Sequence, residues 1–142
     1  MAELSARDTA LRAAEYALSR KAEDVLVLEV RGLSSVTDYV VICSGLSDTQ
    51  VRSIAEGARR GLRADGVRCM HQEGEKYANW VVLDFVDVVV HVMQPEVRIY
   101  YNLEGLWADA PHRRYGEADH PAEDLDGEWA SKDIQGGVVA GE

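Results

Sequence analysis

The sequence lacks the features that mark secreted, membrane-spanning or disulfide-stabilised proteins. Only two of its 142 residues are cysteines, Cys43 and Cys69, and both lie in apolar, strand-like runs where a reduced thiol is expected. No apolar run approaches the roughly 18 residues that a membrane span needs, and the N-terminal segment does not resemble a signal peptide. These absences predict a reduced, cytoplasmic protein that has no membrane partner.

Patterns for metal, nucleotide and cofactor binding are also missing. The histidines show no His-x-x-x-His spacing and the cysteines form no Cys-x-x-Cys pair, so a zinc site has no support. Neither the Gly-x-x-x-x-Gly-Lys nor the Gly-x-Gly-x-x-Gly phosphate loop occurs. We therefore expect no metal, no cofactor and no enzymatic activity. His91, which alternates with valines, is expected on a sheet face with a neighbouring partner.

Basic residues are in the minority, with 15 lysines and arginines against 25 acidic residues and a net charge of -10. Residues 116–142 hold eight acidic residues and one basic residue, whereas residues 1–115 hold 17 and 14. The strongly basic footprint that is typical of nucleic-acid-binding proteins is absent. We therefore expect a basic protein as the partner, without direct sequence-specific contact to nucleic acid.

The chain length suits one domain, residues 1–115, followed by an acidic tail, residues 116–142. The tail has few large apolar residues and is expected to be disordered. Within the domain, Ser5 with Asp8 and Ser47 with Gln50 form two capping boxes. They predict that helices begin at these serines, the first ending near Arg20 and the second at Gly66.

Apolar runs predict five strands, at 25–30, 39–43, 67–72, 80–83 and 88–93. The last two form a hairpin because only residues 84–87 separate them. Pro95 begins a final helix that continues to Trp107. A strand-helix-strand crossover favours parallel pairing and the hairpin is antiparallel, so the fold class is α/β with a mixed five-stranded sheet and helices packed on it.

The sequence is compatible with two catalytic interpretations. The turn around Ser47 is similar to a hydrolase nucleophile elbow, although capping a helix is the commoner use of such a serine. Ser44, Gly45 and Ser47, with Asp84 and Asp87, form the alternative hypothesis of a divergent nucleotidyltransferase-like, nucleotide-binding protein. Asp84 and Asp87 do not have the Asp-x-Asp spacing that points two carboxylates to one sheet face, so turn residues are the commoner interpretation.

The aromatic residues and arginines give further candidates for binding. Trp80 begins a strand, Phe85 lies in a turn where burial is difficult, and Tyr100 and Tyr101 occupy adjacent positions of a helix, so at least one is expected to be exposed. Exposed aromatics near carboxylates are typical of a protein interface. Arg52, Arg59 and Arg63 follow one flank of the second helix, where a solvated face is favoured over a strip for RNA phosphates.

Three segments together, residues 37–47, 80–92 and 95–107, resemble the ribosomal silencing factor family, also called the iojap family. The resemblance implies a mixed α/β domain that is related in shape to nucleotidyltransferases and has no catalytic site. It implies binding to the large ribosomal subunit through ribosomal protein uL14. It also implies that the bound protein blocks joining of the small subunit, which lowers translation when nutrients are scarce.

The resemblance also implies which residues contact the partner. The family uses the tryptophan that opens the fourth strand, the apolar residue in the next turn and a tyrosine of the last helix, which correspond to Trp80, Phe85 and Tyr101. Asp84 and Asp87 are expected to add electrostatic complementarity. Arg98, in the third segment, completes the predicted partner-binding set. When free, the protein is expected to homodimerise through the same surface.

Overall fold

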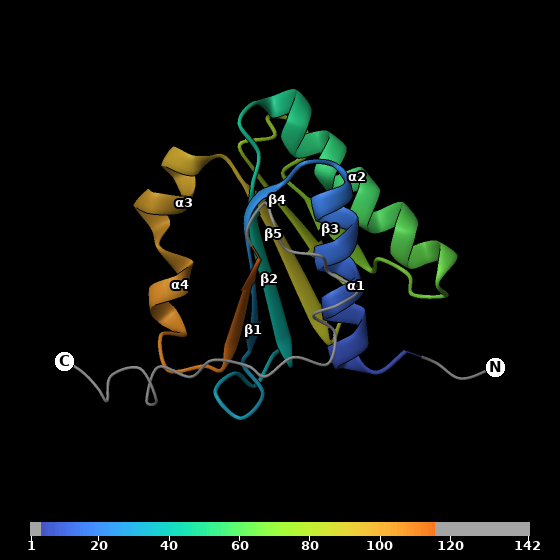
Figure 1. Cartoon of the computed structure of the whole chain (residues 1–142), viewed down its shortest axis with the longest axis vertical. Coiled ribbons are helices and arrows are strands. Elements are labelled where there is room, and N and C mark those ends of the chain that lie inside the picture. The colour runs from blue at the N-terminus through green and yellow to red at the C-terminus, as the bar shows by residue number, and fades with distance from the viewer. Residues whose placement is uncertain (1–3, 116–142) are drawn as a thin grey trace.

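The computed structural model of the chain describes residues 4–115, in which a six-stranded sheet separates two pairs of helices (Figure 1). The strand order is β3-β4-β5-β2-β1-β6, in which β2 and β5 pair in parallel and the other neighbouring strands pair antiparallel. The strands are β1 Glu23–Glu29, β2 Tyr39–Ser44, β3 His71–Glu73, β4 Trp80–Asp84, β5 Val88–Met93 and β6 His112–Tyr115. The predicted mixed α/β fold is confirmed. The predicted tail, residues 116–142, lies outside the described residues.

The two long helices, α1 (Ala6–Ser19) and α2 (Asp48–Ala64), cover one face of the sheet (Figure 1). Both begin as predicted, because the hydroxyls of Ser5 and Ser47 accept hydrogen bonds from the backbone N–H groups of Asp8 and Gln50, at 3.0 and 3.1 Å. The helices bury their apolar stripes against the alternating inward residues of the strands. Within residues 4–115, no helix has the length and apolar character to cross a bilayer.

The opposite face carries two short helices, α3 (Pro95–Tyr101) and α4 (Leu103–Leu106), which form a smaller core with β1, β2 and β5. A single helix through Trp107 was predicted, and that prediction is wrong. The Asn102 N–H makes the last hydrogen bond of α3, to the Arg98 carbonyl. Asn102 itself adopts the left-handed conformation, with a φ of 48°, and this conformation ends the helix. Asparagine tolerates this conformation better than most residues, and helical periodicity does not reveal the break.

Two strand predictions also need correction. The sheet has six strands rather than five, because His112–Tyr115 pairs with β1 as the edge strand β6. This segment has no apolar alternation, and its stability comes from pairing with β1 and from the buried ring of Tyr115. The strand predicted at 67–72 is reduced to His71–Glu73, because the Val67 N–H bonds to the Leu62 carbonyl at the end of α2. The proposed likeness to nucleotidyltransferases stays a prediction.

The β4–β5 hairpin closes through a two-residue loop, Val86 and Asp87, in which the Phe85 N–H bonds to the Val88 carbonyl at 2.8 Å. Val86 has a φ of 78°, a conformation that favours glycine and disfavours a β-branched residue. The side chain of Asp84 accepts a hydrogen bond from the Val86 N–H at 2.8 Å and so supports the turn. Phe85 faces the α1–α2 core and is only 6% exposed, so the expectation that it is difficult to bury is wrong.

The strained turn gives the first prediction. Replacing Val86 by Gly should stabilise the protein by about 1 kcal/mol, because glycine adopts a positive φ without steric cost while the lost valine side chain is half exposed. Val86→Ala is the matched control, since alanine keeps the steric cost and should give no such gain. Urea unfolding of the three proteins measures the differences. A glycine variant less stable than the parent would show that the valine contacts outweigh the strain.

Candidate functional site

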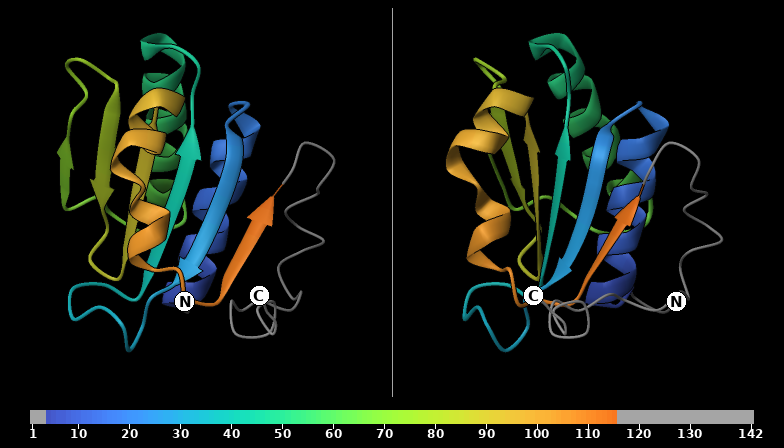
Figure 2. Two further views of the ribbon diagram at one scale, coloured as in Figure 1. Left: turned by 90° about the vertical axis from the view of Figure 1, so that its left-hand side faces the viewer. Right: turned by 60° about the vertical axis from the view of Figure 1, so that its left-hand side comes forward.

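Part of the sheet face that carries α3 and α4 is not covered by a helix. In the left view of Figure 2, α3 and α4 lie in front of β5 and β2, whereas β3 and β4 have no helix in front of them. Strand alternation and register place five side chains on this uncovered part, which we call the open face: Trp80, Val82, Asp84, Val89 and His91. All five are partly exposed, which makes this region accessible to a partner.

An aromatic cluster lies where α3 meets the open face. The rings of Trp80 and Tyr101 are 4.8 Å apart between centroids, and the ring of Tyr100 meets that of Tyr101 edge-on at 4.9 Å. Tyr101 is 54% exposed and Tyr100 is 80% exposed, while Trp80 is half-buried against the smaller core. The expectation that at least one of the adjacent tyrosines is exposed is confirmed. Large aromatic side chains of this kind supply most of the energy in protein interfaces.

His91 fixes the orientation of the tryptophan. The Trp80 Nε1–H donates to His91 Nδ1 at 3.1 Å, which requires that this ring nitrogen carry no proton. Burial lowers the pKa of His91 to about 4, so the ring is neutral and the acceptor is available at neutral pH. The prediction that His91 is a sheet-face residue satisfied by a neighbour is confirmed. Its neighbour is Trp80 on the adjacent strand, a pairing that becomes apparent only from the strand register.

The other predicted residues of the hairpin lie away from this cluster. Asp84 is at the far end of β4, about 13 Å from Trp80 along the strand. Asp84 shares the open face and Asp87 is exposed in the turn, whereas Phe85 points to the opposite side of the sheet. The structure therefore brings Trp80 and Tyr101 together and places the carboxylates at the margin of the same face.

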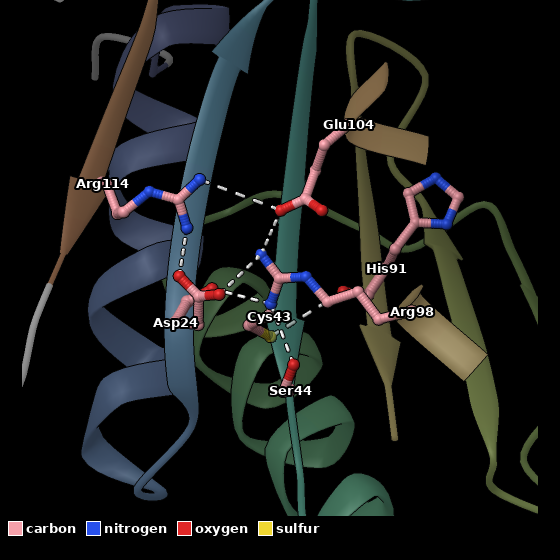
Figure 3. A network of polar contacts seen from close by, with 7 residues as sticks. All are labelled: Asp24, Cys43, Ser44, His91, Arg98, Glu104 and Arg114. Carbon is pink, nitrogen blue, oxygen red and sulfur yellow. Dashed lines mark hydrogen bonds and ion pairs between the residues drawn. The ribbon is translucent and has the colours of Figure 1, made fainter. Parts of the chain in front are cut away.

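Arg98 has a different environment from the one expected for a partner-binding residue. Its side chain is buried, and it donates hydrogen bonds to the Asp24 carbonyl at 2.8 Å and to Ser44 Oγ at 2.9 Å (Figure 3). It also forms an ion pair with Glu104 at 2.6 Å, and Arg114 pairs with the carboxylate of Asp24. Arg98 therefore joins α3 to β1, β2 and α4, and Arg114 extends the network to β6. The predicted surface role of Arg98 is corrected to a structural one. The two carboxylates that neutralise its guanidinium, those of Glu104 and Asp24, belong to the same chain.

Figure 3 also shows Cys43 beneath this network. Both cysteines are free, and Cys43 is buried with its Sγ 3.8 Å from the His91 carbonyl. Burial raises the pKa of the Cys43 thiol to about 12, so the sulfur remains a protonated, unreactive thiol. The expectation of a reduced thiol in the sheet agrees with this environment.

The residues of the nucleotidyltransferase alternative do not converge. Ser47 caps α2 and Ser44 accepts from Arg98, so each hydroxyl has a structural partner. The parallel register pairs Tyr39 with Val88 and Ser44 with Met93, which separates Asp87 from Ser44 by the length of β2, about 17 Å. Among residues 4–115, no group of three histidine, cysteine, aspartate or glutamate side chains is arranged to hold a metal ion.

Comparisons with known proteins lead to one family. The model of the family described as ribosomal silencing factor during starvation matches residues 3–137. The chain belongs to this family. Membership implies association with the ribosome and regulation of translation. The expected resemblance is therefore confirmed over a longer segment than the three motifs that suggested it.

Individual relatives agree with this assignment. The chain is 47% identical over 92 residues to the ribosomal silencing factor RsfS of Bacillus subtilis, an alignment that covers 65% of this chain and 78% of that protein. A crystal structure of a Chromobacterium violaceum protein matches with a TM-score of 0.73 and 31% identity, over 84% of this chain and 98% of that one. A Bacillus halodurans structure matches with a TM-score of 0.61 and 40% identity, over 67% and 89%. These relatives are named as ribosomal silencing factors, a regulatory name and not that of an enzyme.

The Arg98 network of this silencing factor gives the second prediction. Arg98→Ala should destabilise the protein by about 2–3 kcal/mol, because it removes the buried guanidinium and its hydrogen bonds to the Asp24 carbonyl, Ser44 and Glu104, although Arg114 still pairs with Asp24. Arg60→Ala is the control, since it removes an exposed ion pair with Glu56 and should cost less than about 1 kcal/mol. Chemical denaturation measures both values. Equal losses would contradict the structural role of Arg98.

His91 gives the third prediction, which concerns pH. The unfolded chain protonates this histidine near its ordinary pKa of 6.5, but the folded protein does so only near pH 4. Its contribution to the free energy of unfolding is therefore complete above about pH 6.5 and falls as the pH is lowered from 6.5 towards 4, by at most about 3 kcal/mol.

His91→Asn keeps an acceptor for the Trp80 N–H and removes the titrating group, so it should flatten this part of the stability profile. Thermal or urea unfolding at several pH values tests the difference between the two proteins. Parallel profiles for the parent and the asparagine variant would show that His91 is not the group responsible.

Proposed function

We propose that this protein binds ribosomal protein uL14 of the large ribosomal subunit through the aromatic cluster and the open face. The bound domain then occupies the surface on which the small subunit joins, and so lowers translation when nutrients are scarce. The observation that carries the proposal is the exposed Tyr101 ring on the half-buried Trp80, beside a sheet face without a covering helix, in a member of the ribosomal silencing factor family.

The chemistry of this surface supports docking without a catalytic step. Trp80 is held by His91 and by the smaller core, so little side-chain entropy is lost when a partner packs against it. Asp84 and Asp87 add negative charge at the margin, and the whole chain carries a net charge of -10. These charges suit a basic ribosomal protein and act mainly on the association rate and its salt dependence.

The turn between β4 and β5 contributes to the same surface, but through a different residue from the expected Phe85. Phe85 is buried beneath the hairpin, where it supports the loop, and the apolar side chain that the turn exposes is that of Val86, at 55%. We assign the direct apolar contact of the turn to Val86 and a supporting role to Phe85. When no ribosome is bound, the exposed aromatic surface is suited to homodimerisation in the cytoplasm.

Tyr101 gives the fourth prediction. Tyr101→Ala should weaken binding to isolated large subunits by tenfold or more while leaving the fold intact, because the ring is more than half exposed and lies at the centre of the cluster. Ile99→Ala is a matched control, since Ile99 is an exposed apolar residue of the same helix on its opposite side. Co-sedimentation with separated subunits measures the affinities, and thermal melts verify folding.

Adding small subunits to the same mixtures tests the proposed mechanism. The parent protein should reduce formation of whole ribosomes, Ile99→Ala should act like the parent, and Tyr101→Ala should restore joining. Sedimentation of the parent with neither subunit, or full binding by Tyr101→Ala, would refute the proposed surface.

A further inference from the structure

A row of arginines follows the seam between α2 and β3, on the opposite side of the edge strand from the open face. A groove of 380 Å³ opens there, lined by Arg59, Arg63, Arg68, Cys69, Met70, His71 and Gln72. A second groove of 310 Å³ shares Arg59 and Gln72 with it and continues the depression towards Arg52. We call Arg59, Arg63 and Arg68, with the groove between them, the arginine seam.

The positive charge of the arginine seam is not neutralised by its surroundings. Three nearby carboxylates have other partners: Glu56 pairs with Arg60 at 3.2 Å, Asp65 with Arg12 at 3.1 Å, and Glu73 with His71 at 2.7 Å. Glu75, which lines the adjoining groove near Arg52, lies beyond the ion-pair distance of Arg59, Arg63 and Arg68. Among the residues that the structure describes, no carboxylate lies within ion-pair distance of Arg63 or Arg68. The seam is thus a local concentration of unpaired cations on an acidic chain.

The groove is also held in a defined shape. Arg59 donates to Gln72 Oε1 at 3.2 Å, which joins the helix to the edge strand. At the other end, Arg52 donates to the carbonyls of Glu75 and Lys76 at 2.9 and 2.6 Å. These bonds fix α2 against the β3–β4 loop, so the groove is formed before any ligand arrives.

We propose that the arginine seam binds the phosphate backbone of RNA. Arg59 and Arg63 are one helical turn apart, about 6 Å between their Cβ atoms, and Arg68 continues the row past the end of α2. A row of guanidinium groups suits a polymer of repeated phosphates, which each guanidinium contacts through paired N–H donors.

This inference rests on the proposed function, because the RNA would be that of the large subunit on which the domain docks. β3 is the edge strand between the two surfaces: His71 and Gln72 both line the groove, and the register places His71 and Glu73 on the same sheet face as Asp84 and Val82. One large partner containing protein and RNA can therefore contact both sides of this edge. The net charge of -10 opposes strong RNA binding by the free protein, so the aromatic cluster supplies the anchoring contact.

The fifth prediction tests the seam by salt dependence. In the triple variant Arg59→Gln, Arg63→Gln and Arg68→Gln, the slope of log affinity for large subunits against log salt should decrease in magnitude by about 2 to 3, because three phosphate contacts are lost. Affinity at low salt should fall by about tenfold or more. The corresponding triple lysine variant keeps the charge and should retain most of the slope. Arg60→Gln, a single charge loss on the same helix, should change little.

Further binding measurements distinguish failure of this inference from failure of the proposed function. Weakened binding by Tyr101→Ala together with an unchanged slope in the triple glutamine variant would overturn the arginine seam and leave the docking surface intact. If the triple glutamine variant also binds isolated uL14 more weakly than the parent does, with no RNA present, the seam contacts an acidic segment of that protein. This result would also overturn the proposal that the seam binds RNA. If the parent does not bind subunits at all, the probe becomes a polyuridine oligomer at low salt. Weaker binding of that oligomer by the triple glutamine variant would support the seam, and equal or absent binding would overturn it.

Discussion

The buried guanidinium of Arg98 is the interaction on which the arrangement of the smaller helices depends. A buried cation costs several kcal/mol unless charged and polar partners surround it, and here Glu104, Asp24 and Ser44 do so from three other elements. Asp24 adopts a φ of 50° where the β1–β2 register shifts, and that bulge brings its carbonyl to the guanidinium. The network therefore holds α3 in one position on the sheet, and with it the tyrosines at the end of that helix.

The position of α3 determines which part of the sheet is left uncovered. Helices as short as α3 and α4 cover β2 and β5 but do not extend to β3 and β4, so an exposed face remains beside the aromatic cluster. Trp80 brings a polar N–H to this boundary, and the neutral ring of His91 satisfies it. The same hydrogen bond orients the indole. The contact that satisfies the Trp80 N–H therefore also fixes the ring at the surface proposed to bind a partner.

The sequence allowed good predictions of features that depend on nearby residues. The serine caps, the hairpin, the sheet-face position of His91 and the exposure of at least one of Tyr100 and Tyr101 follow from local spacing, and each has the expected place. The burial of Arg98 was missed because two of its partners are 74 and 54 residues away in the chain. β6 was missed because its pairing with β1 does not require an apolar pattern, and Phe85 was misjudged because the turn after it is only two residues long.

A protein that acts by steric exclusion depends on where its bulk is placed as much as on how tightly it binds. A single aromatic contact gives affinity but restricts rotation about that contact only weakly, since hot-spot residues cluster in a small area. A second contact on the other side of β3 would limit this rotation, and the hydrogen bonds from Arg52 and Arg59 make that side of the domain rigid. Under the proposed function, the combination of an apolar anchor and a separate charged seam on one edge of a rigid sheet would set the orientation of the domain on the large subunit, on which steric exclusion depends.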